Sequence, residues 1–146
     1  RTASGVTSVM ASEARAGATP HALAVGAQPA ASPVSDTVVF VTAADASGAR
    51  QVMVTDLGGS PPRAVPGLPA AAWQRPRFSA DGRRLLLVRG YQEIVVATLD
   101  GSEPPRVVWS AGASSVSAAT WAHDGSIVAA VGGYEGDLWL AEGHFP

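Results

Sequence analysis

Short runs of apolar residues, separated by turn-forming residues, make up most of this chain. Residues 85–88, 94–96 and 127–131 are almost entirely apolar. A short continuous apolar run is typical of a strand buried on both faces, whereas a strand with one exposed face alternates between apolar and polar residues. Gly, Pro and Asp gather between the runs, as expected for tight turns. The pattern therefore predicts an all-β chain.

The predicted strands follow one another at short intervals. They cover residues 21–25, 37–42, 51–56, 63–65, 75–78, 84–89, 93–99, 106–109, 118–121, 127–131 and 137–140.

These strands recur as one unit. Phe78 and Trp121 lie 43 positions apart, and each is followed three and four residues later by Asp-Gly, at Asp81 and Asp124. Asp and Gly suit a tight hairpin because both tolerate positive φ. A repeat of about 40–45 residues with several short strands is typical of propeller blades. We expect four-stranded antiparallel sheets in three repeats, at residues 27–66, 73–110 and 116–146.

Three blades are too few for a closed ring, because propellers have at least about four. The third repeat ends one strand short, and residues 21–25 form an unassigned strand before the first repeat. One end of a propeller commonly supplies the missing strand at the other end, and this arrangement would account for both observations. We therefore expect a partial ring, closed by oligomerisation or by a larger parent protein. Two copies would make about six blades.

Residues 1–20 are rich in Ala, Gly, Ser and Thr and have neither helical nor alternating periodicity. Such a segment buries too little apolar surface to offset its ordering entropy, so it is predicted as a flexible tail or linker. A short helix at residues 8–16 is the alternative. Residues 21–146 form the predicted propeller segment, in which 26–35 is a loop or a weak strand broken by Pro29 and Pro33.

Composition excludes several classes of function. The net charge of −2 favours neither nucleic acid nor an anionic membrane as a partner. The chain has no cysteine, and no apolar run approaches the roughly 20 residues needed to span a bilayer. We expect no membrane span.

No catalytic, cofactor or metal site is predicted. His21, His123 and His144 lack the spacing of metal ligands, and the chain has no Gly-x-Ser-x-Gly elbow or phosphate-binding loop. Asp81 and Asp124 recur at one blade position, where the ordinary role is that of a turn residue. The sequence therefore predicts a chain that is not an enzyme and that carries no cofactor.

Arginine and tyrosine supply the candidate partner-binding residues. Six of the ten basic residues lie between positions 75 and 106, and Tyr91 and Tyr134 occupy equivalent loop positions. Exposed aromatic side chains are common anchors of protein interfaces. We expect one rim formed by the turns around Asp81 and Asp124, the loop 90–92 and the arginine cluster. The predicted partner-binding residues are Arg75, Arg77, Arg83, Arg84, Arg89, Tyr91 and Tyr134.

The middle repeat carries a family resemblance. Phe78-Ser79-Ala80-Asp81-Gly82, a strand, then Glu93-Ile94-Val95-Val96 and Leu99-Asp100-Gly101 resemble the repeat of TolB-like (WD40-like) β-propellers. The likeness extends over residues 27–143, weakest in the first repeat, where Pro33 replaces the aromatic. It implies a non-enzymatic scaffold for protein–protein interaction in the periplasm or outside the cell.

Two other functions remain open. Related repeats precede the catalytic domain of prolyl-oligopeptidase-type peptidases, so the chain could be the propeller portion of such an enzyme. It could also be a structural subunit of a larger assembly. In each case we expect a protein partner, either a second copy or the remainder of a larger propeller.

Overall fold

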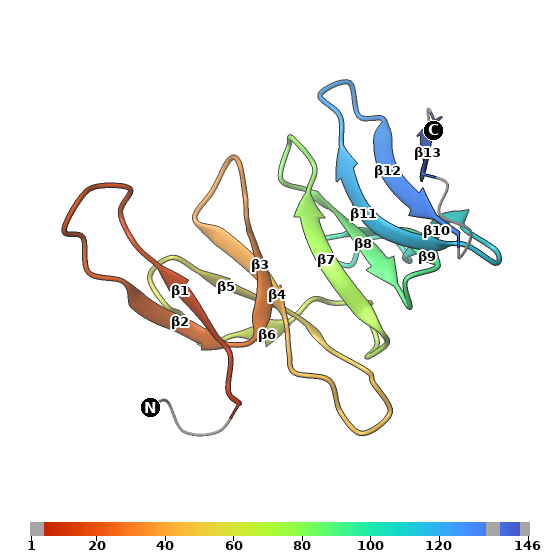
Figure 1. The fold of residues 1–146 in the computed structure, drawn as a ribbon. Helices are drawn as coiled ribbons and strands as arrows, with labels where there is room; N and C mark the ends of the chain where they lie inside the picture. The colour runs from red at the N-terminus through yellow and green to blue at the C-terminus, as the bar shows by residue number, and fades with distance from the viewer. Residues whose placement is uncertain (1–4, 134–137, 144–146) are drawn as a thin grey trace.

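The computed structural model describes residues 5–133 in full and the backbone of residues 138–143 (Figure 1). In this part of the chain all regular secondary structure is β-strand, which confirms the predicted fold class. The strands are β1 (Ser8–Ala11), β2 (His21–Val25), β3 (Ala27–Ala31), β4 (Thr37–Val41), β5 (Val52–Asp56), β6 (Arg63–Ala64), β7 (Trp73–Phe78), β8 (Arg84–Arg89), β9 (Glu93–Thr98), β10 (Arg106–Ser110), β11 (Ser115–Trp121), β12 (Ile127–Gly132) and β13 (Leu138–Gly143).

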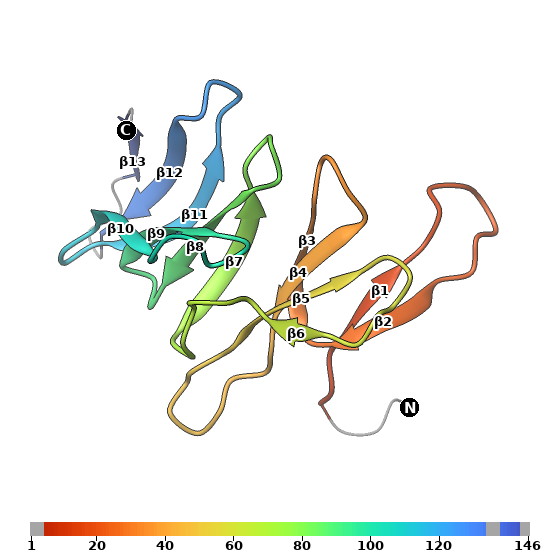
Figure 2. The same cartoon turned by 180° about the vertical axis from the view of Figure 1, so that it is seen from behind.

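The strands form antiparallel sheets in which sequence neighbours pair. β3-β4-β5-β6 and β7-β8-β9-β10 are four-stranded, β11-β12-β13 is three-stranded, and β1-β2 is two-stranded. The sheets stand side by side, with β7 between β3 and β11 (Figures 1 and 2). This is the arrangement of adjacent propeller blades, with β3, β7 and β11 as inner strands.

Strand β8 explains why the sheets stack. Leu85 and Leu87 belong to a buried cluster shared with the β3–β6 sheet, whereas Leu86 and Val88 belong to one shared with the β11–β13 sheet. Successive side chains of a strand point to opposite faces, so a continuous apolar run supplies both clusters at once. All four residues are at most 1% exposed.

The Asp-Gly pairs form the hairpin turns that the sequence predicts. In the β7–β8 turn the Ser79 hydroxyl donates to Asp81 Oδ1 at 2.6 Å, and Gly82 has a φ of 71°. In the β11–β12 turn the Ser126 N–H donates to Asp124 Oδ1 at 2.9 Å, and Gly125 has a φ of 85°. Glycine adopts this φ without steric cost, which explains its place in both turns.

The N-terminal segment differs from its prediction. Residues 8–11, predicted as part of a tail or a short helix, form strand β1. β1 pairs with β2, the strand predicted at 21–25, and Val9 is buried against Leu23 and Phe40. The tail prediction is wrong for these residues because pairing and burial by neighbours outweigh weak local propensity. Residues 27–31 form strand β3, which agrees with the weak strand predicted here, and its register shift accommodates Pro29.

Candidate interaction surfaces

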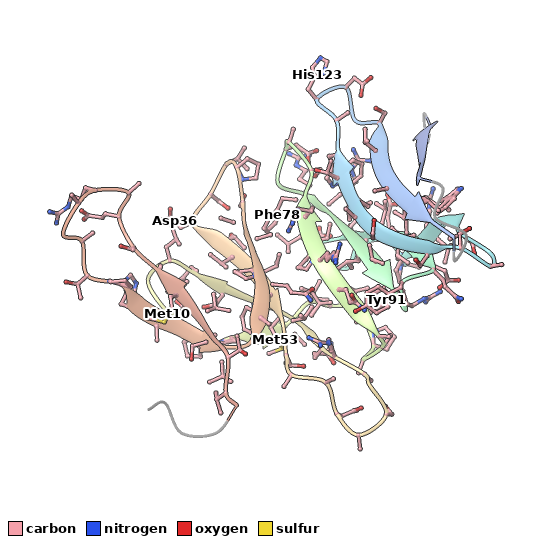
Figure 3. The ribbon with its side chains drawn as sticks, in the orientation of Figure 1. Met10, Asp36, Met53, Phe78, Tyr91 and His123 are labelled. Atoms are coloured by element: carbon pink, nitrogen blue, oxygen red, sulfur yellow. The ribbon has the colours of Figure 1, made fainter. Side chains whose placement is uncertain are left out.

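The predicted site residues lie in three separate places. Arg83 and Arg84 lie at the β7–β8 turn, whereas Arg89 and Tyr91 lie at the opposite end of β8. Figure 3 shows the same separation between His123, at the turn end of the third sheet, and Tyr91. The prediction of one rim is therefore wrong, because a strand of six residues separates its parts.

The two ends of the sheets form two distinct faces. The turn face is the end of the sheets that carries the turns at residues 79–83 and 122–126. The loop face is the opposite end, which carries residues 90–92 and 111–115. Arg75 and Arg77 lie on inner strand β7, between the two faces. Tyr134 lies outside the residues that the structure describes.

Tyr91 is an exposed aromatic in a constrained loop. Its side chain is 52% exposed, and its φ of 60° is uncommon for a residue with a bulky side chain. The Val116 N–H donates to the Tyr91 carbonyl at 2.6 Å, and the Ala111 N–H donates to the Gln92 carbonyl at 2.7 Å. The first bond comes from strand β11 of the next sheet and the second from the residue directly after β10, and together they hold the loop in place, so the ring is presented by an ordered backbone.

A shallow groove of about 340 Å³ adjoins Tyr91 on the loop face. Small residues dominate its wall, so a protein side chain could enter beside the tyrosine ring. The lining residues are Gly90, Tyr91, Gln92, Ala113, Ser114, Ser115, Gly132 and Gly133.

Two of the predicted arginines make contacts within the fold. Arg89 Nε donates to Glu93 Oε2 at 2.6 Å, and its guanidinium lies 5.6 Å from the centre of the Trp73 ring. The Arg84 guanidinium lies 5.0 Å from the centre of the Trp121 ring. Cation–π contacts of this kind join strand ends and neighbouring sheets. Arg84 and Arg89 therefore have structural roles that the sequence did not reveal.

The turn face has a hollow of about 580 Å³ with charges of both signs. Arg63, Arg83 and Arg84 line it together with Asp81, Asp100 and Glu103. Hydrogen bonds from Ser79 and from the Arg83 N–H lower the pKa of Asp81, and bonds from Ser102 lower the pKa of Asp100. A carboxylate that is ionised and held by its own turn is poorly suited to general acid catalysis. These aspartates act as turn residues.

A third hollow, of about 410 Å³, lies along the inner strands. Its wall combines Gln28 and Pro29 of β3, Arg75 and Arg77 of β7, and Ala118 and Ala119 of β11. We call it the inner-strand groove. The sequence pattern pointed to the two arginines and missed Gln28. The available signal was a repeated dipeptide, because Gln28-Pro29 and Arg75-Pro76 occupy corresponding inner strands.

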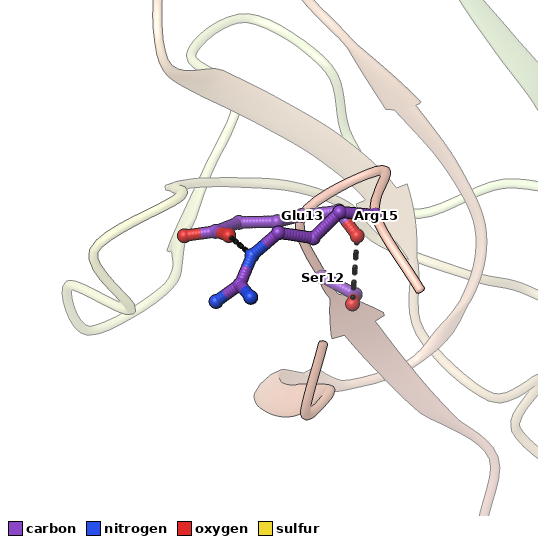
Figure 4. A network of polar contacts seen from close by, with 3 residues as sticks. All are labelled: Ser12, Glu13 and Arg15. Carbon is purple, nitrogen blue, oxygen red and sulfur yellow. Dashed lines mark hydrogen bonds and ion pairs between the residues drawn. The ribbon is translucent and has the colours of Figure 1, made fainter. Parts of the chain in front are cut away.

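The remaining polar features are local. Figure 4 shows the β1–β2 loop, where Glu13 pairs with Arg15 and the Ser12 hydroxyl donates to the Glu13 carbonyl at 3.2 Å. Both charged side chains are about 70% exposed, so the pair contributes little. Over the described residues, no cluster of three His, Cys, Asp or Glu side chains could hold a metal ion. In the same part of the chain, no helix is long and apolar enough to cross a membrane.

Comparison with known proteins supports the fold. The chain is similar to a chain in the crystal structure of the nidogen/laminin complex, with a TM-score of 0.51 and 16% sequence identity. The match covers 84% of this chain and 52% of that chain, so this chain spans about half the length of its solved neighbour. At this identity the likeness shows the fold alone. No family model and no curated protein sequence matches this chain.

Proposed function

We propose that this chain is a non-enzymatic β-propeller segment that binds a protein partner through its loop face, outside the cytoplasm. The observation that carries the proposal is Tyr91. Its ring is exposed beside a groove of small residues, and its backbone keeps a strained φ because Val116 of the next sheet and Ala111 after β10 donate hydrogen bonds to the loop. Strain of this kind clusters at functional sites.

The energetics of interfaces favour this residue as an anchor. Tyr supplies a large contact area and loses little conformational entropy on binding, and it is enriched among interface hot spots. A loop that is already ordered lowers the entropic cost of association further. The solved neighbour belongs to a complex of two proteins, which is in keeping with a propeller used as a binding scaffold. The extracytoplasmic location rests on the resemblance to TolB-like repeats.

Site-specific photo-crosslinking tests the proposal. A benzoylphenylalanine replaces Tyr91 in the chain expressed in its native cells, and the fractions inside and outside the cytoplasm are compared. We expect one discrete protein adduct, in the extracytoplasmic fraction. Leu57 is the matched control, because it is 42% exposed but follows β5 at the turn end of the sheets. Equal adducts from both positions, or none from position 91, would contradict the proposal.

We also propose that this chain is part of a ring completed by further blades. Among the residues whose side chains the structure describes, seven large apolar side chains are exposed, and three of them, Val6, Met10 and Val25, lie on or beside the β1–β2 sheet. A neighbouring blade would cover such an apolar surface, and the match with the similar solved chain covers only 52% of that chain. The further blades belong either to a second copy or to the rest of a longer protein.

Light scattering coupled to size exclusion separates these two sources. A discrete dimer is expected if a second copy completes about six blades. In that case Met10→Asp lowers the dimer fraction, because it places a charge in the contact. A monomer at high concentration assigns the missing blades to a longer parent chain.

A further inference from the structure

The inner-strand groove has a chemistry of its own, distinct from that of the loop face. β3, β7 and β11 stand next to one another as the inner strands of three sheets, and each contributes to the wall of the groove (Figures 1 and 2). Pro29, Ala118 and Ala119 give it small apolar walls. Gln28, Arg75 and Arg77 are its polar lining, and no acidic residue contributes.

Irregular backbone occurs in all three inner strands beside this groove. The register shifts between Ala27 and Ala30 in β3, between Gln74 and Arg77 in β7, and between Val116 and Ala118 in β11. A bulge frees residues from the ladder and redirects their side chains, and bulges are common beside binding sites. Gln28, Pro29 and Arg75 of the groove lie within these shifts and have no ladder partner, whereas Arg77, Ala118 and Ala119 remain paired at the edges of the irregularities.

The first two bulges share a strained conformation. Gln28 has a φ of 54° and Arg75 a φ of 53°, and each is followed by proline. A residue with a β-carbon adopts this region at a cost, and a following proline restricts its backbone further. The same strain in two consecutive blades orients both side chains toward one groove.

The hydrogen bonds within the fold use only some of the polar groups of Gln28, Arg75 and Arg77, so N–H donors remain for a ligand. The Arg75 N–H donates to Gln28 Oε1 at 2.6 Å, which uses the amide oxygen and leaves the amide nitrogen as a donor. Arg77 Nη1 donates to the Pro76 carbonyl at 3.0 Å. Within residues 5–133, ion pairs join Arg15, Arg89 and Arg106 to glutamates, and none involves Arg75 or Arg77.

The hollow on the turn face differs from the inner-strand groove in its charges. There Arg63, Arg83 and Arg84 share a hollow with three carboxylates, so the hollow contains its own counter-charges. In the inner-strand groove two guanidinium groups and one amide face a space without a carboxylate. Such a site attracts an anion from outside.

We propose that the inner-strand groove binds the carboxylates of an acidic peptide segment, held by Arg75 and Arg77 with a further hydrogen bond from the Gln28 amide. The planar guanidinium fork matches a carboxylate in two parallel hydrogen bonds. A peptide carboxylate fits better than a phosphate, because Pro29 and Pro76 have no N–H and that of Arg75 is already used. Phosphate sites usually rely on several such backbone donors.

An NMR titration of the full chain tests the proposal. The probe is a capped peptide of alternating Glu and Gly, compared with the same peptide in which Gln replaces each Glu. The reporters are the Nε–H signals of Arg75 and Arg77 and the indole N–H of Trp121, which lies 3.4 Å from the Arg77 carbonyl oxygen. We expect the Glu peptide to shift these signals, with an affinity that falls as salt rises, and the Gln peptide to leave them unchanged.

Variants identify the groups that bind. Arg75→Gln and Arg77→Gln are each expected to weaken binding by about tenfold, since each removes a charge-assisted hydrogen bond. Gln28→Glu keeps the oxygen that accepts the Arg75 N–H but places a carboxylate in the groove, so we expect it to abolish binding in a folded chain. Arg63→Gln is the control, because it removes an exposed arginine of the turn face and should leave the affinity unchanged.

Several results would overturn the proposal. Equal shifts from the Gln peptide, an Arg63→Gln effect as large as that of Arg75→Gln, or unchanged binding by Gln28→Glu would each do so. Inorganic phosphate that shifts the reporters when the Glu peptide does not would assign the site to a different anion. Tyr91→Ala should leave the titration unchanged, so failure here is distinguishable from failure of the loop-face proposal.

Discussion

The middle sheet, β7–β10, and the terminal sheet, β1–β2, use similar residues in different surroundings. In β8 the four residues from Leu85 to Val88 are at most 1% exposed. In β1 Val9 is 2% exposed, whereas its neighbour Met10 is 52% exposed. The middle sheet is covered on both faces, and among the described residues the terminal sheet packs only against the β3–β6 sheet. Position in the stack, more than residue type, decides which apolar side chains are buried.

Truncation of one apolar side chain in each of these two sheets should give the largest difference in the free energy of unfolding. Leu87→Ala removes a side chain that is 0% exposed, so we expect a loss of about 2–5 kcal/mol in the free energy of unfolding. Met10→Ala in the terminal sheet is expected to change it by less than about 0.5 kcal/mol. Urea unfolding of both variants measures the difference. Similar losses would mean that Met10 is covered in solution by another blade or copy.

A substitution at the junction between the terminal sheet and the β3–β6 sheet should have the second largest effect on the free energy of unfolding. A β-carbon at Gly26 would lie 2.3 Å from Phe40 Cδ2 and 2.8 Å from the Val41 carbonyl oxygen. Gly26→Ala is therefore expected to cost about 1–3 kcal/mol through overpacking. Gly132→Ala in β12 is the matched control, because no atom of the fully described residues lies within 4 Å of its β-carbon position. A neutral Gly26→Ala would show that β1–β2 can move away from Phe40.

The contact between the middle and third sheets at the turn face should contribute less to the free energy of unfolding. Arg84 lies over the Trp121 ring, 5.0 Å from its centre, and both residues adjoin solvent. A double-mutant cycle with Arg84→Gln and Trp121→Leu is expected to give a coupling energy of about 0.5–1 kcal/mol. A coupling energy near zero would mean that the guanidinium and the indole ring do not interact in solution.

The smallest expected effect is a pH dependence in the β7–β8 turn. Hydrogen bonds from Ser79 and the Arg83 N–H lower the pKa of Asp81 below its value in the unfolded chain. A carboxyl with a lowered folded pKa stabilises the fold above the unfolded value of about 4, and this contribution is lost as pH falls. Asp81→Asn should therefore lose less stability than the parent chain when the pH falls from about 5 to about 2.

Urea unfolding at several pH values tests whether Asp81 contributes to the pH dependence of stability. Ser79→Ala removes the largest cause of the lowered pKa, so it should reduce the pH dependence in the same direction. If both variants keep the slope of the parent chain, the acid sensitivity arises elsewhere.

The central strands were predictable because their signals are local. The predicted strand 84–89 matches β8, and the predicted strand 93–99 differs from β9 by one residue. Continuous apolar runs bounded by Asp-Gly turns specify these strands wherever they pack. The aromatic residues at the repeated position have the same role in both sheets, since Phe78 and Trp121 each pack against a core between sheets.

The candidate sites were less predictable. Arg84 and Arg89 lie at opposite ends of strand β8. Because a strand rises by about 3.3 Å per residue, two arginines that are close in sequence lie on different faces of the molecule. Their contacts with Trp121 and Trp73, and the bond from Arg75 to Gln28, link parts of the chain that no local pattern relates. Gln28 lies 47 positions before Arg75, and only the packing of two blades brings them together.

The sequence by itself determined the central strands, the turns and their repeat, because backbone propensity and side-chain periodicity act within a few residues. The tertiary structure decided which faces of the sheets are buried and which arginines contact a tryptophan ring. It also decided that Gln28, Arg75 and Arg77 line one groove to which no acidic residue contributes. Those outcomes depend on which sheet stands beside which. A weak strand such as Ser8–Ala11 forms because β2 pairs with it and Phe40 helps to bury Val9.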